Sequence, residues 1–153
     1  MVRGPNVFGG YLGGAAGGGA PDATADAFAP DGWFRTGDLG RADPDGYLRI
    51  VGRSKELIIT GGYNVYPRDV EEVLGRHPGV AEVAVVGRPD PEWGERVVAC
   101  VVAAGPAGAG DAGAILAWAA DHLAAYQRPR ELRFVDELPR NALGKVVRSR
   151  LSP

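Results

Sequence analysis

The sequence predicts a small domain of mixed strands and helices, α+β or α/β in class, with a short parallel or mixed sheet covered by helices. Short apolar runs bounded by glycine and proline are typical of buried strands. Between them, stretches whose apolar residues recur every three or four positions indicate amphipathic helices. The domain is expected over residues 53–153, and residues 1–52 precede it as a separate region that contains a β-hairpin.

The region before the domain has an unusual, glycine-rich stretch at residues 13–20. It predicts a flexible loop or linker and not a phosphate-binding loop, because no Gly-Lys-Ser/Thr follows it. A short helix is expected over Pro21–Phe28, where alanine is frequent. The turn sequence Pro44-Asp45-Gly46 lies within a stretch that predicts a hairpin over Leu39–Val51.

The first half of the domain is expected to hold a strand and a helix. A short apolar run predicts a strand within Glu56–Thr60, which Gly61 and Gly62 end. A helix then opens at Pro67 and runs through Arg76, because proline is favoured in the first helical turn. Its apolar face carries Val70, Val73 and Leu74, and its acidic residues near the positive N-terminal end are Asp69, Glu71 and Glu72.

The second half alternates strands with loops and one more helix. The expected elements are strands Val80–Val86 and Val97–Ala103 around a polar loop at Gly87–Arg96, a flexible loop at Ala107–Gly113, a helix at Ala114–Ala125, a strand at Glu131–Val135 and a loop with a basic tail at Leu138–Leu151. This order of elements fits one compact sheet with helices packed on it.

Composition excludes several classes of protein. At 153 residues with a net charge of −2, the chain has room for one ordinary domain and shows no overall basic footprint for nucleic acid. No apolar run reaches the roughly 18–20 residues that span a bilayer, and the first residues do not form a signal peptide. Because Cys100 is the single cysteine and lies in an apolar run, we expect a cytoplasmic protein with this residue in its core. His77 and His122 lie far apart, and no metal site is predicted.

The two lysines, Lys55 and Lys145, stand out against fifteen arginines, since Lys and Arg together number 17. In a chain so rich in arginine, a surface cation without a specific role is expected to be an arginine. Lysine differs in carrying a compact, rotatable charge on a flexible stem, whereas the arginine head group is a rigid planar fork. This bias favours a specific role for both lysines.

Three stretches carry a resemblance to a known family: residues 33–38 (Trp-Phe-Arg-Thr-Gly-Asp), residues 52–71 and residues 138–145 (Leu-Pro-Arg-Asn-Ala-Leu-Gly-Lys). In this order and spacing the chain resembles the adenylate-forming superfamily of acyl- and aryl-CoA synthetases, peptide-synthetase adenylation domains and luciferases. The resemblance implies that residues 1–52 are the remnant of the last subdomain of a large N-terminal domain. Residues 53–153 would then be the small, mobile C-terminal domain.

The resemblance implies an ATP-binding role for three residues. Asp38 would accept hydrogen bonds from the ATP ribose hydroxyls, which a carboxylate at a rigid turn can do for two donors at once. Arg53 would contact the ribose or phosphate region. Lys145 would reach the acid carboxylate and the α-phosphate during adenylation, where a mobile ammonium offsets the repulsion between two anions.

The resemblance also implies a hinge and a CoA side. Lys55 falls at the family's hinge position, where a solvated residue can change φ and ψ without disturbing a core. Gly61 and Gly62 would line the pantetheine passage, which must exclude Cβ atoms. The residues expected to hold the CoA nucleotide are Trp93, Tyr126, Arg128 and Arg130. Gln127 departs from the lysine that relatives often carry there.

The expected activity is the C-terminal part of an ATP-dependent acyl-CoA synthetase, with a carboxylic acid, ATP and CoA as small-molecule partners and Mg²⁺ carried by ATP. The phosphate loop, the adenine- and magnesium-binding element and the acid pocket are absent from the sequence. The chain is therefore expected to need the missing N-terminal domain and to be inactive alone. The alternatives are an amino-acid-activating enzyme that loads a carrier protein, or a non-catalytic binding or complementing module.

Overall fold

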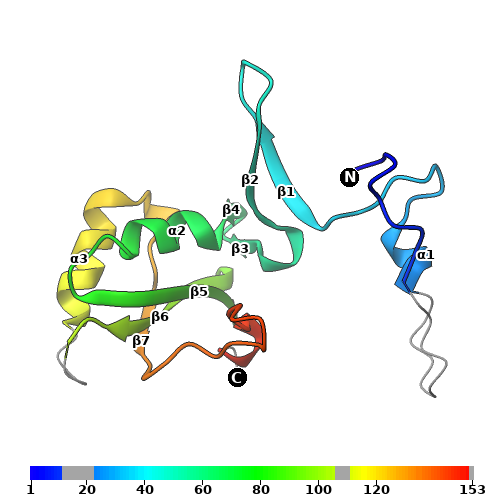
Figure 1. Cartoon of the computed structure of the whole chain (residues 1–153). Helices are drawn as coiled ribbons and strands as arrows, with labels where there is room; N and C mark the ends of the chain where they lie inside the picture. Colours follow the sequence, from blue (N-terminus) through cyan, green and yellow to red (C-terminus); the bar gives the residue numbers. More distant parts are fainter. Residues whose placement is uncertain (12–22, 106–110, 152–153) are drawn as a thin grey trace. The chain divides into compact units, whose positions relative to one another are not determined.

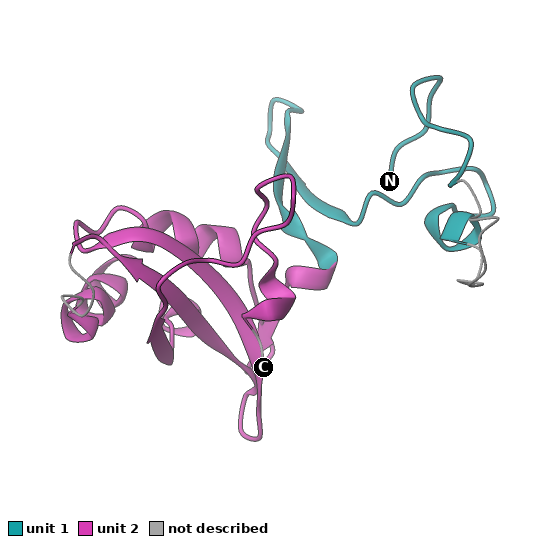
Figure 2. Cartoon of the chain, turned by 60° about the horizontal axis from the view of Figure 1, so that its bottom comes forward, with its two compact units in different colours: residues 1–54 teal, residues 55–153 magenta. Residues whose placement is uncertain are grey.

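The computed structural model describes residues 1–11, 23–105 and 111–151 and forms two compact units, residues 1–54 and 55–153 (Figures 1 and 2). The glycine-rich stretch at residues 13–20, the start of the helix predicted from Pro21 and most of the flexible loop predicted over Ala107–Gly113 lie outside the described residues. None of the described helices is long and apolar enough to cross a membrane.

The first unit contains a short helix and a two-stranded hairpin. Helix α1 spans Ala23–Ala27, and the antiparallel strands β1 and β2 span Asp38–Ala42 and Leu48–Arg53. The Asp43 carboxylate closes the hairpin turn by accepting hydrogen bonds from the backbone N–H groups of Asp45 and Tyr47. The predicted hairpin is thus confirmed and is slightly longer than expected.

The second unit is built on a five-stranded mixed sheet. Its strands are β3 (Ile58–Thr60), β4 (Tyr63–Val65), β5 (Val80–Asp90), β6 (Gly94–Ala103) and β7 (Glu131–Phe134). Strand β6 pairs antiparallel with β5 and β3 and parallel with β7, while β4 pairs antiparallel with β3. This mixed α+β domain confirms the predicted fold class.

The sheet is covered on both faces. Helices α2 (Pro67–Leu74) and α3 (Ala112–His122) lie over one face and the C-terminal segment lies over the other (Figure 1). Along β6, Val97, Ala99 and Val101 pack toward the helices, and Val98 and Cys100 pack toward the C-terminal segment. Because both faces of this strand are buried, its apolar run is continuous instead of alternating.

Cys100 lies in this core as predicted, with 1% of its surface exposed. Burial disfavours the thiolate, and it raises the pKa of the Cys100 thiol above its ordinary value. An inert, protonated thiol is what a core position requires.

The polar loop predicted over Gly87–Arg96 is wrong in extent. Strand β5 continues to Asp90 and β6 begins at Gly94, which leaves the turn only residues 91–93. Backbone pairing continues through Arg88 with Arg96 and Pro89 with Glu95. Since ion pairs instead of apolar burial fix these side chains, hydrophobic patterning does not reveal the extension.

Other boundaries differ for local reasons. Helix α3 begins earlier than predicted because the Asp111 carboxylate accepts a hydrogen bond from the Ala114 N–H at 3.0 Å, an N-cap contact. Residues Ala125–Gln127 form a separate 3₁₀ turn, η2. Strand β4 was not predicted, because three residues are too few to show a period. The expected C-terminal loop contains a 3₁₀ turn, η3, over Arg148–Arg150.

Candidate functional site

A cavity of about 250 Å³ opens between three segments of the second unit. The segments are the turn between β3 and β4, the turn between β5 and β6, and the chain from η2 toward β7. Its lining residues are Thr60, Tyr63, Trp93, Ala125, Tyr126 and Arg130. The structure therefore brings together Trp93, Tyr126 and Arg130, three of the four residues predicted to hold the CoA nucleotide. We call the cavity lined by these six residues the aromatic cavity.

Two hydrogen bonds of its backbone fix the position of Trp93 in the aromatic cavity. Its N–H donates to the Asp90 carboxylate at 3.0 Å, and its carbonyl accepts a hydrogen bond from the Gly61 N–H at 2.9 Å. A Cβ on Gly61 would lie 2.8 Å from the Trp93 ring, so a side chain at position 61 would displace the indole. Gly61 also has a φ of 54°, which glycine adopts without steric cost.

Two stacked pairs give the aromatic cavity its chemistry. The Arg130 guanidinium lies 4.0 Å from the centroid of the Trp93 ring, within the range of a cation–π contact. The rings of Tyr63 and Tyr126 stack with centroids 4.8 Å apart and an interplanar angle of 17°. A planar base could stack on such rings, and the guanidinium could pair with a phosphate.

Arg128 does not line the aromatic cavity. Its Nε donates to the Leu123 carbonyl at 3.0 Å and its Nη2 donates to the Ala120 carbonyl at 2.7 Å. These carbonyls lie at the C-terminal end of α3, where a cation complements the helix dipole. Its neighbour Gln127 is also occupied locally, since its side-chain oxygen accepts a hydrogen bond from the Ala124 N–H.

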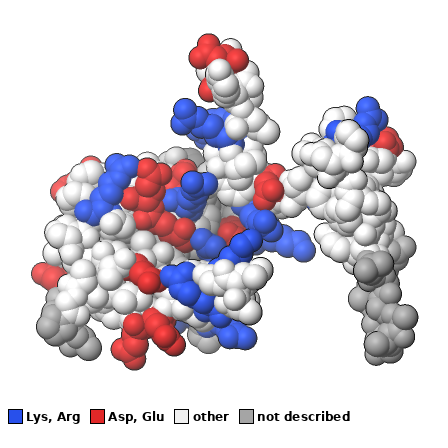
Figure 3. Space-filling view, viewed as in Figure 1, with Lys and Arg blue, Asp and Glu red and all other residues white. Residues whose placement is uncertain are grey.

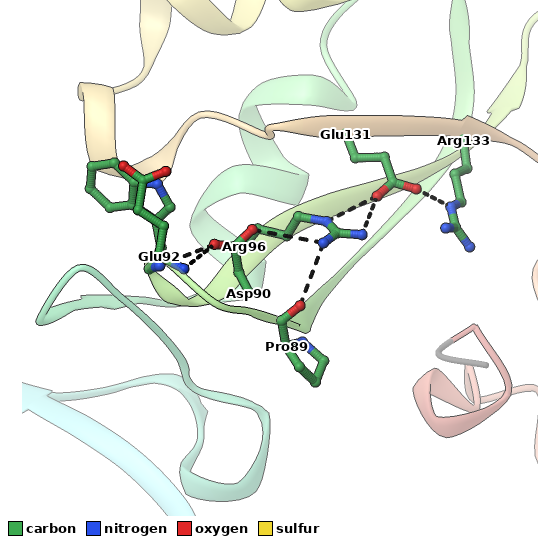
Figure 4. Close-up of polar contacts among 7 residues, drawn as sticks. Pro89, Asp90, Glu92, Arg96, Glu131 and Arg133 are labelled. Atoms are coloured by element: carbon green, nitrogen blue, oxygen red, sulfur yellow. Dashed lines mark hydrogen bonds and ion pairs between the residues drawn. The ribbon is translucent and has the colours of Figure 1, made fainter.

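A charged network of Asp90, Arg96, Glu131 and Arg133 adjoins the aromatic cavity (Figure 4), because Asp90 accepts the Trp93 N–H and Glu131 directly follows Arg130. Arg96 pairs with Glu131 at 3.0 Å and with Asp90 at 3.7 Å, and Arg133 pairs with the other oxygen of Glu131. The hydrogen bond from the Trp93 N–H lowers the pKa of the Asp90 carboxyl below its ordinary value. The hydrogen bond from Arg133, followed by that from Arg96, lowers the pKa of the Glu131 carboxyl.

The first unit brings together Asp38, predicted to bind the ATP ribose, and Arg53, predicted to contact the ribose or phosphate region. Asp38 and Arg53 are partners across the hairpin, and the Arg53 Nε lies 3.2 Å from the Asp38 carboxylate. The Asp38 N–H donates to the Thr36 hydroxyl at 3.1 Å, which fixes the turn before β1. Most of the Arg53 side chain is exposed, so its fork can turn toward a ligand.

Lys145 lies at the exposed end of a tight turn. The Asn141 side-chain oxygen accepts hydrogen bonds from the Leu143 and Lys145 N–H groups, and Arg140 donates to the Gly144 carbonyl at 2.8 Å. Among the residues that the structure describes, no carboxylate pairs with the Lys145 ammonium. The turn is thus well ordered while its cation is left available.

Lys55 is the first residue of the second unit and lies in the 3₁₀ turn η1 (Ser54–Glu56). It is exposed and, within the described part of the chain, makes no ion pair. Lys55 and Glu56 border a second cavity, of about 420 Å³, with Arg148 at its side. Figure 3 shows basic and acidic side chains interspersed on the face in view, in keeping with the small net charge.

Several residues of the site were not predicted from the sequence. Tyr63 and Thr60 line the aromatic cavity, and Asp90 and Arg96 support it. A signal for Tyr63 was present, because it directly follows the glycine pair that the prediction singled out. Among the described residues, no group of three or more His, Cys, Asp or Glu side chains could hold a metal ion.

Comparison with known proteins assigns the family. Residues 69–145 match the model of the AMP-binding enzyme C-terminal domain. The chain belongs to this family. It is 50% identical over 151 residues to a sulfoacetate–CoA ligase of Cupriavidus necator, covering 99% of this chain and 28% of that protein. The resemblance read from the three sequence motifs is confirmed by this match.

Solved structures agree. ATP-bound MatB from Rhodopseudomonas palustris superposes with a TM-score of 0.84 at 43% identity, over 97% of this chain and 28% of that one. The o-succinylbenzoate CoA synthetase of Bacillus subtilis, in complex with its acyl-adenylate intermediate, gives 0.85 at 38% identity, over 99% of this chain and 29% of that one. This family member therefore spans somewhat more than a quarter of the length of the proteins it matches.

Proposed function

We propose that the chain is the C-terminal part of an ATP-dependent acyl-CoA synthetase, with residues 1–52 from the end of a large N-terminal domain and residues 53–153 as the small C-terminal domain. The whole enzyme would convert a carboxylic acid and ATP to an acyl-adenylate and pyrophosphate. It would then convert the acyl-adenylate and CoA to acyl-CoA and AMP. A cytoplasmic location goes with this proposal.

The observation that carries the proposal is the aromatic cavity beside Gly61. Its rings offer flat faces to the adenine of CoA, and Arg130 offers a guanidinium to a CoA phosphate. Gly61 and Gly62 would let pantetheine pass along the backbone, because neither has a Cβ. Arg128, which is engaged at the end of α3, would contribute to the phosphates only by leaving its carbonyl partners.

On the adenylation side, Lys145 would stabilise the developing negative charge between the acid carboxylate and the α-phosphate. A preorganised turn supports this role, because the ammonium can be delivered without reordering the backbone. Asp38 would hold the ribose, and Arg53 would contact the ribose or phosphate region. Mg²⁺ would arrive with ATP, and its protein ligands would lie outside this chain.

Lys55 would be the hinge between the two half-reactions. Support comes from its exposed position at the first residue of the second unit. A residue at such a junction can change its backbone angles at little cost in packing.

The test is a chimera in which this chain replaces the matching C-terminal part of MatB. We expect acyl-CoA formation with the acid that the MatB body accepts. Trp93→Ala and Arg130→Ala should raise the KM for CoA and leave pyrophosphate exchange unchanged, and the arginine effect should fade with salt because exposed charges are screened.

Two outcomes would overturn the proposal. A chimera that adenylates the acid but loads a phosphopantetheinyl carrier protein instead of CoA would favour the amino-acid-activating alternative. If neither acceptor is used, and the MatB body alone adenylates as well as the chimera, a non-catalytic binding module is the better description.

The isolated chain, which lacks the triphosphate clamp, should release no pyrophosphate from ATP above a protein-free blank.

A further inference from the structure

We propose that Arg96 is a positioning residue for the aromatic cavity, holding the Trp93 turn and the Arg130 segment in register so that the pair presents one preformed face to a nucleotide. The inference rests on the proposed CoA-binding role of the cavity. Arg96 itself does not line the cavity, so its effect would pass through the two residues that do.

One end of the Arg96 side chain holds the turn between β5 and β6. The guanidinium Nη1 lies 3.7 Å from the Asp90 carboxylate and donates to the Pro89 carbonyl at 3.4 Å. Asp90 in turn accepts hydrogen bonds from the N–H groups of Glu92 and Trp93, both at 3.0 Å. The orientation of the Trp93 backbone is therefore fixed by a carboxylate that Arg96 contacts.

The other edge of the same guanidinium holds the start of β7. Its Nε and Nη2 both contact one oxygen of Glu131, at 3.1 and 3.0 Å. Glu131 directly follows Arg130, whose own N–H donates to the Val97 carbonyl at 2.9 Å. Figure 4 shows Arg96 lying between Asp90 and Glu131 and reaching toward both. Two segments that are more than thirty residues apart in sequence thus meet through one planar group.

An arginine suits this place better than a lysine does. The planar fork can serve partners on two sides at once, whereas an ammonium acts as a single point charge. The side chains of Arg96, Asp90 and Glu131 are 32%, 16% and 27% exposed, so the contacts are partly shielded from solvent and from salt. The geometry between Trp93 and Arg130 is consequently preset before any ligand arrives.

Loss of Arg96 should leave the fold intact, which makes the proposal testable. Glu131 would keep its ion pair with Arg133, and Asp90 would keep its two backbone N–H donors. Neither carboxylate would be left without a partner.

The experiment measures binding of adenosine 3′,5′-bisphosphate and of CoA to the 153-residue chain by calorimetry. Arg96→Met is expected to weaken both by about fivefold or more, the effect of losing one well-placed stacking partner. Arg96→Lys should recover little of this, while Asp90→Asn, whose amide oxygen can still accept the turn N–H groups, should bind better than Asp90→Ala. Arg76→Met, which removes an exposed pair with Glu72, is the matched control and should bind as the parent does.

A cycle with Trp93→Ala separates positioning from general stability. Because Arg96 is proposed to act through both Trp93 and Arg130, Arg96→Met should cost less in the Trp93→Ala background than in the parent, and nothing further in the Trp93→Ala/Arg130→Ala background. An equal loss in all three backgrounds, or full affinity in Arg96→Met, overturns the proposal.

A second readout needs no ligand. Hydrogen exchange at the Glu92 and Trp93 amides should quicken in Arg96→Met, and unchanged exchange there would also overturn it. Absence of nucleotide binding to the parent chain, with quickened exchange in the variant, would instead refute the CoA role of the cavity.

Discussion

At the scale of single residues, two neighbouring glycines have different reasons to be glycine. Gly61 and Gly62 both have positive φ, 54° and 81°, so each would strain a side chain. Only Gly61 faces an obstacle, because its Cβ would meet the Trp93 ring, whereas a Cβ on Gly62 would meet nothing within 4 Å. The family resemblance assigned both glycines to the pantetheine passage and did not distinguish between them.

Gly61→Ala is therefore expected to displace Trp93 and to weaken binding of adenosine 3′,5′-bisphosphate. Gly62→Ala is the matched control, because it adds a comparable backbone strain in open space. Calorimetry on the two variants should show reduced affinity for Gly61→Ala alone. Equal affinities, with both variants folded, would mean that the Trp93 position does not govern nucleotide binding.

Lys145 carries the sharpest prediction for the chemical step. In the MatB chimera, Lys145→Ala should slow adenylation by roughly 10²–10³-fold, because a preorganised cation at a developing anion is lost. Thioester formation from supplied acyl-adenylate should be much less affected. Pyrophosphate exchange and acyl-CoA formation measure the two steps separately, and equal losses in both would contradict the assigned role.

At the scale of elements, the C-terminal segment is tied to the rest of its unit by Arg148. Its guanidinium contacts Glu71 of α2 at 2.8 Å and Glu56 of η1 at 3.2 Å, and Glu71 also accepts the Val85 N–H of β5. Arg148 thus joins a helix and a turn directly, and a strand through Glu71, to the segment that bears Lys145.

Arg148→Ala is expected to lower the free energy of unfolding by about 1–3 kcal/mol, because Glu71 loses a charged partner while it is largely buried. Urea unfolding measures this loss. Arg150→Ala, three residues from the chain end and outside the ion pairs of the described residues, is the control and should change stability by less than about 0.5 kcal/mol. A variant as stable as the parent would show that the contacts add nothing.

The Asp90–Arg96–Glu131 network predicts a pH dependence. Both carboxyls have folded-state pKa values below their ordinary ones, so the unfolded chain binds more protons in mild acid. The stabilisation is present above the ordinary pKa values, near pH 4, and is lost as the pH falls through the lowered ones.

Urea unfolding between pH 6 and pH 3, a range of about three units around these values, should show this loss in the parent. Asp90→Asn/Glu131→Gln should flatten the fall. Asp121→Asn/Glu137→Gln removes the same charge from exposed carboxylates outside the network and should retain the parent's steepness. Identical profiles for all three proteins would contradict the linkage.

Much of the second unit could be predicted from sequence because its signals are local. Apolar runs predicted the cores of β5 and β6 and the burial of Cys100, and a proline predicted the start of α2. The extension of the β5–β6 hairpin could not be predicted, since its polar side chains are held by ion pairs such as that of Arg96 with Glu131, thirty-five positions away, and show no apolar pattern. The hydrogen bonds of Arg128 at the end of α3 could not be predicted either, because a sequence motif gives the type of a residue and not its hydrogen-bond partners.

At the scale of the whole molecule, the division into two units coincides with the residue proposed as the hinge. The first unit ends at Ser54 and the second begins at Lys55. The domain boundary at residue 53 and the hinge role of Lys55 both stay predictions. They are tied to one another, because a hinge has a function only where two bodies meet.

Lys55→Pro tests the hinge in the MatB chimera. Proline fixes φ near −65° and also restricts Ser54, so the junction should be held in one orientation. We expect one half-reaction, followed by pyrophosphate exchange or by acyl-CoA formation, to survive better than the other. Lys55→Ala is the control, since it removes the charge and keeps the backbone free. Parallel loss of both half-reactions with an unchanged Tm would rule Lys55 out as the hinge.

The scarcity of lysine has a practical consequence. Because Lys55 and Lys145 are both exposed and unpaired within the described part of the chain, amine-reactive reagents meet only these two side chains besides the α-amine. One of the two targets lies at the junction of the units and the other lies on the turn proposed to enter the adenylation site. Lys55 and Lys145 can therefore serve as two natural labelling sites. Their protection from the reagent by bound nucleotide can be measured from peptide masses, without introducing any substitution.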